Sequence, residues 1–287
     1  MPELPRLNNA IRLLEEGKVP LATFSPPTVE SAVALATAAY DAVIFEMEHN
    51  PYDITDLRDS LQYLLNRRQI LDRGSLAPAV TPMVRVPSNG ADMNQWIPKQ
   101  VLDVGVFGIV FPHVSSVDQA YNAVASCRYA RPASSPLYEP QGHRGDQPAN
   151  AARYWGITQQ EYYAKADVWP LNPQGEILVI IQCEQAKTID NLPQILDKVK
   201  GIGVVLIGEG DLSQSLGYPR QYEHPAVVEA MTAIRRICAE HGVACGHPHA
   251  DAKNAQKIVE DGYRFVMAAP TRSFTGLDAC RKATGRT

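Results

Sequence analysis

Residues 177–184 read Ile-Leu-Val-Ile-Ile-Gln-Cys-Glu, and the run is apolar as far as Gln182. A strand that is apolar throughout suits burial on both faces, which parallel sheets require. Side chains alternate between the two faces of a strand, so Gln182 and Glu184 point one way and Cys183 points the other. The stretch therefore predicts a buried parallel strand that ends in a polar pair.

The rest of the chain repeats this kind of run. Seven further short apolar runs cover residues 21–24, 42–45, 82–86, 108–111, 204–207, 243–245 and 265–268. Segments with helical spacing lie between most of them, at residues 29–39, 54–65, 117–127, 188–199, 226–241 and 253–261. Eight strand–helix repeats predict an α/β fold of the (β/α)8 TIM-barrel type. An open doubly wound sheet is the alternative, but no Gly-x-Gly-x-x-Gly follows the first strand.

Two segments interrupt this alternation. Residues 65–81 form an enlarged, charged connection before the third strand, and residues 129–176 are rich in Pro, Gly, Tyr and Gln. Loops of that length are usually functional or disordered. We expect a lid with short helices over 129–176, because residues 149–155 contain good helix formers and aromatics. No linker or low-complexity tract divides residues 1–287, so we expect a single domain.

Composition narrows the class of protein. Apolar residues make up 45% and charged residues 20% of the 287 positions, which is ordinary for a globular chain with a large core. The net charge is 27 − 31 = −4 without a single-sign run, so we expect no nucleic-acid partner. No apolar stretch reaches the ~20 residues of a membrane span, and the N-terminus lacks a secretory core. Five separated cysteines without a Cys-x-x-Cys pair are typical of reduced thiols in the cytoplasm.

Polar residues gather where the predicted strands end. In a TIM barrel the catalytic groups lie at the carboxyl ends of the strands and in the loops that follow. The residues found there are Glu46, Glu48, His49, Arg85, Gln182, Glu184, Glu209, Gly210, Asp211, His247 and His249. They come from five segments and would converge on one rim, which is the candidate active site.

Glu184 and Asp211 are the candidate metal ligands. A carboxylate that faces the barrel axis without compensation costs several kcal/mol, so Glu184 needs a cation or a proton. Asp211 follows a glycine-rich turn after the next strand. Two carboxylates without a thiolate suit Mg²⁺ or Mn²⁺, with Co²⁺ as a further candidate. The alternative, on spacing alone, is a structural ion pair between Glu184 and an arginine.

The remaining rim residues each allow two interpretations. Arg85, flanked by apolar residues on a strand, is either half of a buried ion pair or an oxyanion-stabilising group. His49 is either an acid–base residue or a structural loop histidine. Asp211 could simply cap a helix, or its amide and that of Gly210 could bind a carboxylate.

His247 and His249 resemble a His-x-His metal pair. Without a third nearby imidazole or thiolate, we expect a rim contact or loop packing rather than zinc. Glu46 and Glu209 are further candidates for contacts at the rim.

In order, these segments resemble the HpcH/HpaI aldolase/citrate lyase family, class II (metal-dependent) pyruvate aldolases on a TIM barrel. The resemblance runs from about residue 21 to about residue 274. The segments that carry it are residues 40–49, 83–87, 100–105, 142–145, 182–184 and 207–219, followed by His224-Pro225. Residues 207–219, Ile-Gly-Glu-Gly-Asp-Leu-Ser-Gln-Ser-Leu-Gly-Tyr-Pro, are the most specific of them.

The resemblance implies roles for individual residues. Glu184 and Asp211 match the family's metal ligands, and Gln182 matches a glutamine beside the bound oxo acid. The amides of Gly210 and Asp211 match those that hold the substrate carboxylate.

Three further positions match catalytic residues of the family. Arg85 matches the arginine that stabilises the enolate oxygen, and His49 matches the acid–base histidine. Asp103 matches the aspartate that pairs with this histidine, often across a subunit boundary.

The implied activity is cleavage or formation of a 4-hydroxy-2-oxo acid, giving pyruvate and an aldehyde through a metal-stabilised enolate, without an organic cofactor. Decarboxylation of oxaloacetate or a similar β-keto acid by the same enolate is the alternative. A catalytically inactive barrel that binds 2-oxo acids is the alternative from another class. The resemblance also implies a homo-oligomer, from dimer to hexamer, that exchanges a C-terminal helix at residues 275–282.

The chain departs from the family at two motifs. Glu46-Met47-Glu48-His49 stands where the family commonly has Asp-Gly-Glu-His, and Gly208-Glu209-Gly210-Asp211 stands where it has Gly-Pro-x-Asp. These positions lie beside the expected pocket, so the acceptor aldehyde stays open.

Overall fold

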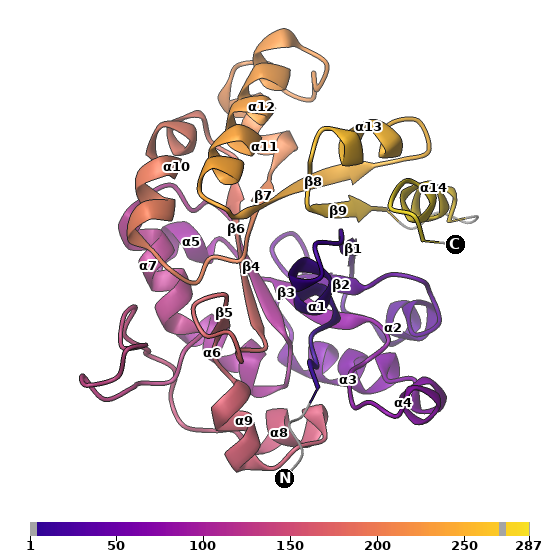
Figure 1. Ribbon diagram of the computed structural model, residues 1–287, viewed down its shortest axis with the longest axis vertical. Helices are drawn as coiled ribbons and strands as arrows, with labels where there is room; N and C mark the ends of the chain where they lie inside the picture. Colours follow the sequence, from indigo (N-terminus) through magenta and orange to yellow (C-terminus); the bar gives the residue numbers. More distant parts are fainter. Residues whose placement is uncertain (1–4, 270–273, 287) are drawn as a thin grey trace.

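The computed structural model describes residues 5–269 and 274–286, and eight parallel strands in this part of the chain close into a barrel (Figure 1). In ring order they are β1 (Leu21–Ser25), β2 (Ala42–Glu46), β3 (Thr81–Arg85), β4 (Gly108–Phe111), β6 (Ile177–Cys183), β7 (Val204–Ile207), β8 (Ala244–Ala250) and β9 (Phe265–Ala268). β4 pairs with β6, and β9 pairs with β1, which closes the ring. The predicted TIM barrel is confirmed.

Two strands differ from the prediction. β5 (Val168–Trp169) is a short strand that pairs with the first residues of β6 and lies outside the ring. β8 continues to Ala250, five residues past its predicted end, and its pairing with β9 shifts register between His247 and Ala250. A proline usually ends a strand. Here the register shift accommodates Pro248 within β8, so the strand continues beyond the apolar run from which it was predicted.

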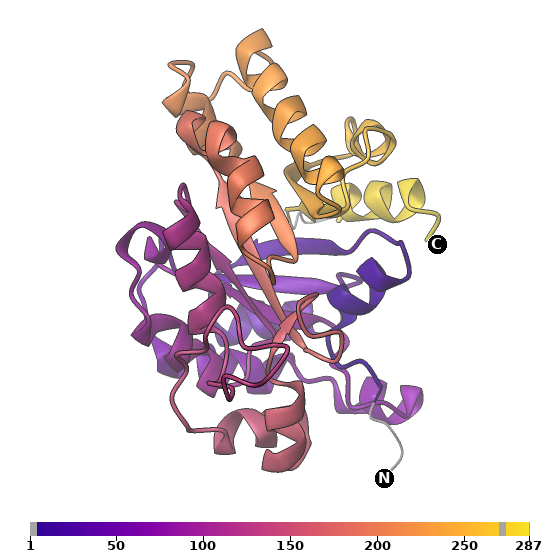
Figure 2. The same cartoon turned by 60° about the vertical axis from the view of Figure 1, so that its left-hand side comes forward.

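Helices surround the barrel (Figure 2). All six predicted helices are present, as α2 (Val29–Leu35), α3 (Ile54–Leu64), α7 (Val117–Ser126), α10 (Ala186–Lys198), α12 (Pro225–Glu240) and α13 (Ala255–Glu260). The others are α1 (Asn9–Glu15), α4 (Arg67–Arg73), α5 (Asn89–Asp92), α6 (Trp96–Asp103), α8 (Ala149–Trp155), α9 (Gln159–Lys165), α11 (Glu209–Ser215) and α14 (Thr275–Ala283). Among the described residues, no helix is both long and apolar enough to cross a membrane.

The barrel interior is packed with side chains rather than open. The strands contribute Ala22, Ala42, Ile44, Met83, Val110, Leu178, Ile180, Val204, Leu206, Phe265 and Met267 to one apolar cluster. Ile11 and Leu14 of α1 join it and close the amino-terminal end of the barrel. Ile181 and Cys183 pack instead in the layer between strands and helices. Gln182 and Glu184 therefore face inward, as predicted.

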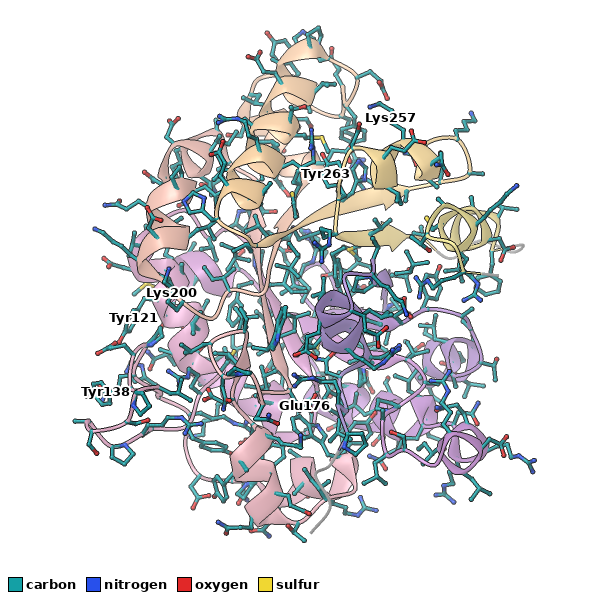
Figure 3. The ribbon with its side chains drawn as sticks, viewed as in Figure 1. Tyr121, Tyr138, Glu176, Lys200, Lys257 and Tyr263 are labelled. Carbon is teal, nitrogen blue, oxygen red and sulfur yellow. The ribbon has the colours of Figure 1, made fainter. Side chains whose placement is uncertain are left out.

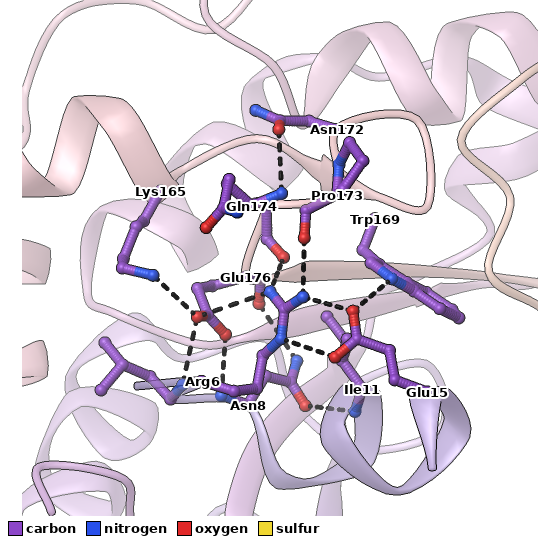
Figure 4. Close-up of polar contacts among 12 residues, drawn as sticks. Arg6, Asn8, Ile11, Glu15, Lys165, Trp169, Asn172, Pro173, Gln174 and Glu176 are labelled. Carbon is purple, nitrogen blue, oxygen red and sulfur yellow. Dashed lines mark hydrogen bonds and ion pairs between the residues drawn. The ribbon is translucent and has the colours of Figure 1, made fainter. Parts of the chain in front are cut away.

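A buried carboxylate fastens α1 to the barrel. Glu176, just before β6, accepts hydrogen bonds from the backbone N–H groups of Leu7 (3.1 Å) and Asn8 (2.9 Å) and from Nζ of Lys165 (3.3 Å) (Figure 4). Buried charges persist when they are paired in this way. The network fixes the end of the barrel opposite the polar strand ends.

The segment 129–176 is not a lid over the candidate site. It runs from the end of α7 to the start of β6, and both lie at the amino-terminal end of the barrel. Trp155 of α8 stacks on Phe107, just before β4, with ring centroids 4.3 Å apart, and its Nε1 donates to the carbonyl of Gly105 (2.8 Å). The lid expectation was wrong because the segment follows a helix, whereas loops at the candidate site follow strands. The helix expected at 149–155 is confirmed as α8.

The C-terminal helix lies on its own barrel. Leu277 and Cys280 of α14 are buried, and the helix contacts α13, β9 and β1 of the same chain. Beyond it, Nη1 of Arg286 lies 2.8 and 2.7 Å from the two carboxylate oxygens of Asp41. A single chain thus has the helix in place without exchange, and exchange between copies stays a prediction.

Candidate active site

Arg85 is the centre of a charged cluster at the carboxyl ends of the strands. It pairs in register with Glu46, and its Nε donates to Oε2 of Glu46 at 2.7 Å. Its Nη1 lies 3.1 Å from Oε2 of Glu48 and 3.3 Å from Oε1 of Gln182. The guanidinium also stacks over the ring of Phe24, 4.4 Å from its centroid. Arg85 therefore balances two carboxylates and is held rigidly beside Gln182.

Glu184 is buried without an arginine partner in the described part of the chain, its side chain being 1% exposed. Oε2 accepts from Nε2 of Gln182 (3.0 Å), and Oε1 accepts from the backbone N–H of His113. Burial raises the pKa of Glu184 to about 7, and the nearby charges of Glu48 and Asp211 act in the same direction. The alternative of a structural ion pair with an arginine is therefore not adopted. Among the described residues, the one ion-pair partner of this carboxylate is the imidazole of His113, whose Nδ1 lies 3.3 Å from Oε1.

Gly208, at the end of β7, allows Glu184 to come this close. A Cβ at position 208 would lie 2.3 Å from Oε2 of Glu184, nearer than any real contact. α11 begins at the next residue, and Gly210 and Asp211 lie in its first turn, where backbone N–H groups have no partner within the helix. The Gly208–Asp211 segment thus brings the carboxylates of Glu184 and Asp211 close to the first-turn backbone N–H groups of Gly210 and Asp211.

Two cavities meet at Asp211. One, of about 600 Å³, is lined by Glu184, Asp211 and His113 among others. The second, of about 290 Å³, is lined by Asp211 together with Arg85, Gln182 and His49. Asp211 itself is exposed. The predicted metal ligands therefore share one cavity, and the predicted substrate residues share the other.

The donor set fits a hard divalent ion. Glu184 and Asp211 offer only oxygen, which Mg²⁺ and Mn²⁺ prefer. Close by, Oε2 of Glu48 is buried and ion-paired with Arg85 but accepts no hydrogen bond of normal geometry, and burial raises the pKa of this carboxyl. Among residues 5–269 and 274–286, no group of three or more His, Cys, Asp or Glu side chains forms a complete metal cage. A site with two protein ligands leaves positions for substrate oxygens and water.

His113 is a site residue that the sequence reasoning missed. It follows β4, and its Nδ1 lies 3.3 Å from Oε1 of Glu184 while its Nε2 lies 3.5 Å from Oε1 of Glu48. The rule that found the other residues, polar groups just after a strand, applies equally to Pro112-His113. A single histidine after an apolar run gave no further signal.

His49 lies at the rim with its side chain 67% exposed. Its backbone N–H donates to Oε1 of Glu46 (3.2 Å), and its Nε2 lies 3.6 Å from Oε2 of Glu48. The structure places it in the lining of the smaller cavity beside Arg85.

Asp103 lies elsewhere, at the end of α6. It accepts from Nη2 of Arg144 (2.9 Å), whose guanidinium stacks over Tyr129 (4.5 Å) and also donates to the hydroxyl of Tyr162 (2.7 Å). Burial raises the pKa of Asp103, against the opposing effect of Arg144. Within the described residues of one chain, no contact joins Asp103 to His49.

The other predicted rim residues separate into two places. Glu209 is buried, and its Oε2 lies 2.8 Å from Nδ1 of His249; both line the smaller cavity. His247 instead packs edge-on against Tyr263, with ring centroids 4.9 Å apart, in the groove between α12 and α13 where Figure 3 labels Tyr263. Burial lowers the pKa of His247 to about 4. The side chains of His247 and His249 therefore do not converge on a single metal site.

Comparisons with known proteins agree on one family. The model of the family described as HpcH/HpaI aldolase/citrate lyase matches residues 23–273. The chain is 34% identical to the 2-keto-3-deoxy-L-rhamnonate aldolase of Escherichia coli O157:H7 over 257 residues, or 88% of this chain and 83% of that protein. It is 30% identical to the hydroxypyruvate/pyruvate aldolase of Paraburkholderia phytofirmans over 239 residues, 83% and 82% of the two chains.

A solved structure indicates the same family. A HpcH/HpaI aldolase/citrate lyase family protein from Burkholderia cenocepacia superposes with a TM-score of 0.73 at 28% identity, over 96% of each chain.

Proposed function

Because the chain belongs to the HpcH/HpaI aldolase/citrate lyase family and is an enzyme of its aldolase and lyase class, we propose that it cleaves a 4-hydroxy-2-oxo acid. The products are pyruvate and an aldehyde, and the same site runs the reaction in the direction of synthesis. The observation that carries the proposal is Glu184, a buried carboxylate that lines one cavity together with Asp211 and forms no ion pair with a lysine or arginine among the described residues.

Glu184 and Asp211 would hold a divalent ion, Mg²⁺ or Mn²⁺ with Co²⁺ as a further candidate. When bound, such an ion supplies Lewis-acid stabilisation for negative charge on the 2-oxo oxygen of the substrate. Burial of Glu184 makes its contact with the ion worth more than it would be in water.

Arg85 and Gln182 would orient the oxo acid and favour its reaction. The guanidinium of Arg85 is fixed by Glu46 and Glu48 before substrate arrives, so aiming it at developing charge costs no reorganisation. The free amides of Gly210 and Asp211 would bind the substrate carboxylate.

His49 would move the proton, either directly or through one water, because it lines the same cavity as Arg85 and is open to solvent. Asp103 lies against Arg144 and would meet His49 only from a second copy of the chain. The proposed enzyme is therefore a homo-oligomer, from dimer to hexamer. We place it in the cytoplasm, and its substrates are a small 2-oxo acid and an aldehyde.

The test is release of pyruvate from a panel of 4-hydroxy-2-oxo acids that includes 2-keto-3-deoxy-L-rhamnonate, followed with a lactate dehydrogenase couple. We expect release that EDTA abolishes and Mg²⁺ or Mn²⁺ restores, and that Glu184→Gln removes. Glu229→Gln, at an exposed acid on α12, is the matched control and should keep full activity. Undiminished release after complete chelation refutes the proposal. Carbon dioxide and pyruvate from oxaloacetate, added to the same assay, without aldehyde release from the panel would identify decarboxylation of a β-keto acid instead.

A further inference from the structure

His113 links three neighbouring parts of the rim. β4 pairs with β6, so the residue after β4 lies directly beside the residues after β6. The backbone N–H of His113 and its Nδ1 both approach Oε1 of Glu184, and its Nε2 reaches Oε1 of Glu48 after β2. The imidazole is 26% exposed, so it is mostly enclosed between the two carboxylates.

The backbone of His113 has a conformation that other residues adopt more readily than histidine. Its φ is +56°, in the left-handed region that glycine and asparagine adopt readily and other residues avoid. A histidine held there indicates that its side chain is used, because non-glycine residues persist in this region only when their surroundings fix them. Here the ring nitrogens lie beside Glu184 and Glu48, and Nδ1 also lies 3.4 Å from Nε2 of Gln185.

Glu184 has little else to fix its rotation. Its other contact among the described side chains is Nε2 of Gln182, on the opposite oxygen. Groups that hydrogen-bond a metal ligand orient it and raise affinity, and their loss typically lowers metal affinity by ~10–100-fold.

We propose that His113 is a positioning residue of the metal centre, which orients the carboxylate of Glu184 for a divalent ion and ties it to Glu48. The inference rests on the proposed function, since it requires Glu184 to bind the ion. None of the roles that the family resemblance implies falls on this position.

The experiment measures Mn²⁺ binding to the metal-free full-length protein, from the electron paramagnetic resonance signal of free Mn²⁺. His113→Gly keeps the backbone N–H and suits the left-handed conformation, and His113→Asn adds a shorter polar side chain. We expect Mn²⁺ affinity to fall by ~10-fold or more in both variants. The urea midpoint of metal-free His113→Gly should equal or exceed that of the wild type, because its backbone strain is relieved. A merely structural role would instead lower stability and leave Mn²⁺ affinity unchanged.

His241→Asn is the matched control, because it removes an imidazole at the end of α12, and its affinity should stay within ~2-fold of the wild type. Wild-type binding that neither His113 variant weakens overturns this inference alone. A wild-type protein that binds no Mn²⁺ overturns the proposed metal centre, and this inference with it. A directly bound ¹⁴N coupling in the spin-echo spectrum of the Mn²⁺-loaded wild type, lost in His113→Gly, would also overturn it, since His113 would then be a ligand.

Discussion

Glu184→Gln should make the metal-free protein more stable at pH 8. Burial raises the pKa of Glu184 from its usual 4.5 to about 7. At about 1.36 kcal/mol for each pH unit between these values, the ionised carboxylate costs the fold about 3 kcal/mol above pH 7. A glutamine avoids that cost. It gives back about 1 kcal/mol, because an amide nitrogen only donates, so the glutamine can accept from His113 or from Gln182 but not from both. The expected net gain is about 2 kcal/mol.

The gain should depend on pH in a defined direction. Below pH 4.5 the carboxyl is protonated in both the folded and the unfolded chain, so burial of Glu184 carries no ionic cost. Between pH 4.5 and about 7 the unfolded chain ionises first, so wild-type stability falls as pH rises through this window and the variant escapes that fall. The difference between the two proteins should therefore be near zero at pH 5.

The assay is urea unfolding of both proteins after exhaustive chelation, at pH 5 and pH 8. Adding Mn²⁺ at about 100 times its dissociation constant should stabilise the wild type by about 2.7 kcal/mol and leave Glu184→Gln unchanged. Glu229→Gln controls for loss of a surface charge. A variant that is less stable than the wild type at pH 8 without metal, or a difference independent of pH, would refute the reasoning that Glu184 is buried without a cation.

Three further changes test other parts of the structure. Gly208→Ala places a Cβ 2.3 Å from Oε2 of Glu184, so Mn²⁺ affinity measured by titration calorimetry should fall by at least ~10-fold. His247 is buried with its pKa lowered to about 4 from 6.5, so the unfolded chain takes up its proton first as pH falls. Wild-type stability should drop by about 3 kcal/mol between pH 6.5 and 4, and His247→Phe should lose this part of the slope in urea titrations. Asp167→Asn leaves Arg128 buried without its carboxylate partner at 2.6 Å, so unfolding free energy should fall by about 3–5 kcal/mol. Because Asp167 lines neither of the two cavities at Asp211, kcat of the folded Asp167→Asn protein should be unchanged.

The fold could be predicted because its signal is local. Each buried strand appears in the sequence as a short apolar run, and each helix between the strands shows apolar residues at helical spacing. Neither pattern depends on contacts between distant residues. Gln182 and Glu184 could be assigned to the interior from alternation alone. The apolar run placed the end of β8 too early, because Pro248 is accommodated by a register shift that pairing with β9 permits.

The contacts within the site depend on which strands become neighbours. The predicted barrel already made the strands that became β4 and β6 neighbours, but only the backbone turn after β4, where the φ of His113 is +56°, brings its N–H and its ring to Glu184. The lid expectation failed for a related reason, because length and composition do not tell on which end of the barrel a segment packs. Arg85 was expected to be either an ion-pair partner or an anion-binding group; in the structure it pairs with Glu46 and Glu48 and still lines the cavity.

The central proposal is that this site removes a methyl proton from pyruvate, and that Glu184 and Asp211 would hold a divalent ion that supplies Lewis-acid stabilisation for the resulting charge. Its most direct test is exchange of the pyruvate methyl protons in deuterium oxide, followed by proton NMR without any aldehyde. We predict exchange in the presence of Mg²⁺ that stops after EDTA and does not occur in Glu184→Gln or Asp211→Asn. Exchange that continues undiminished in the chelated enzyme, or in both variants, would contradict the account.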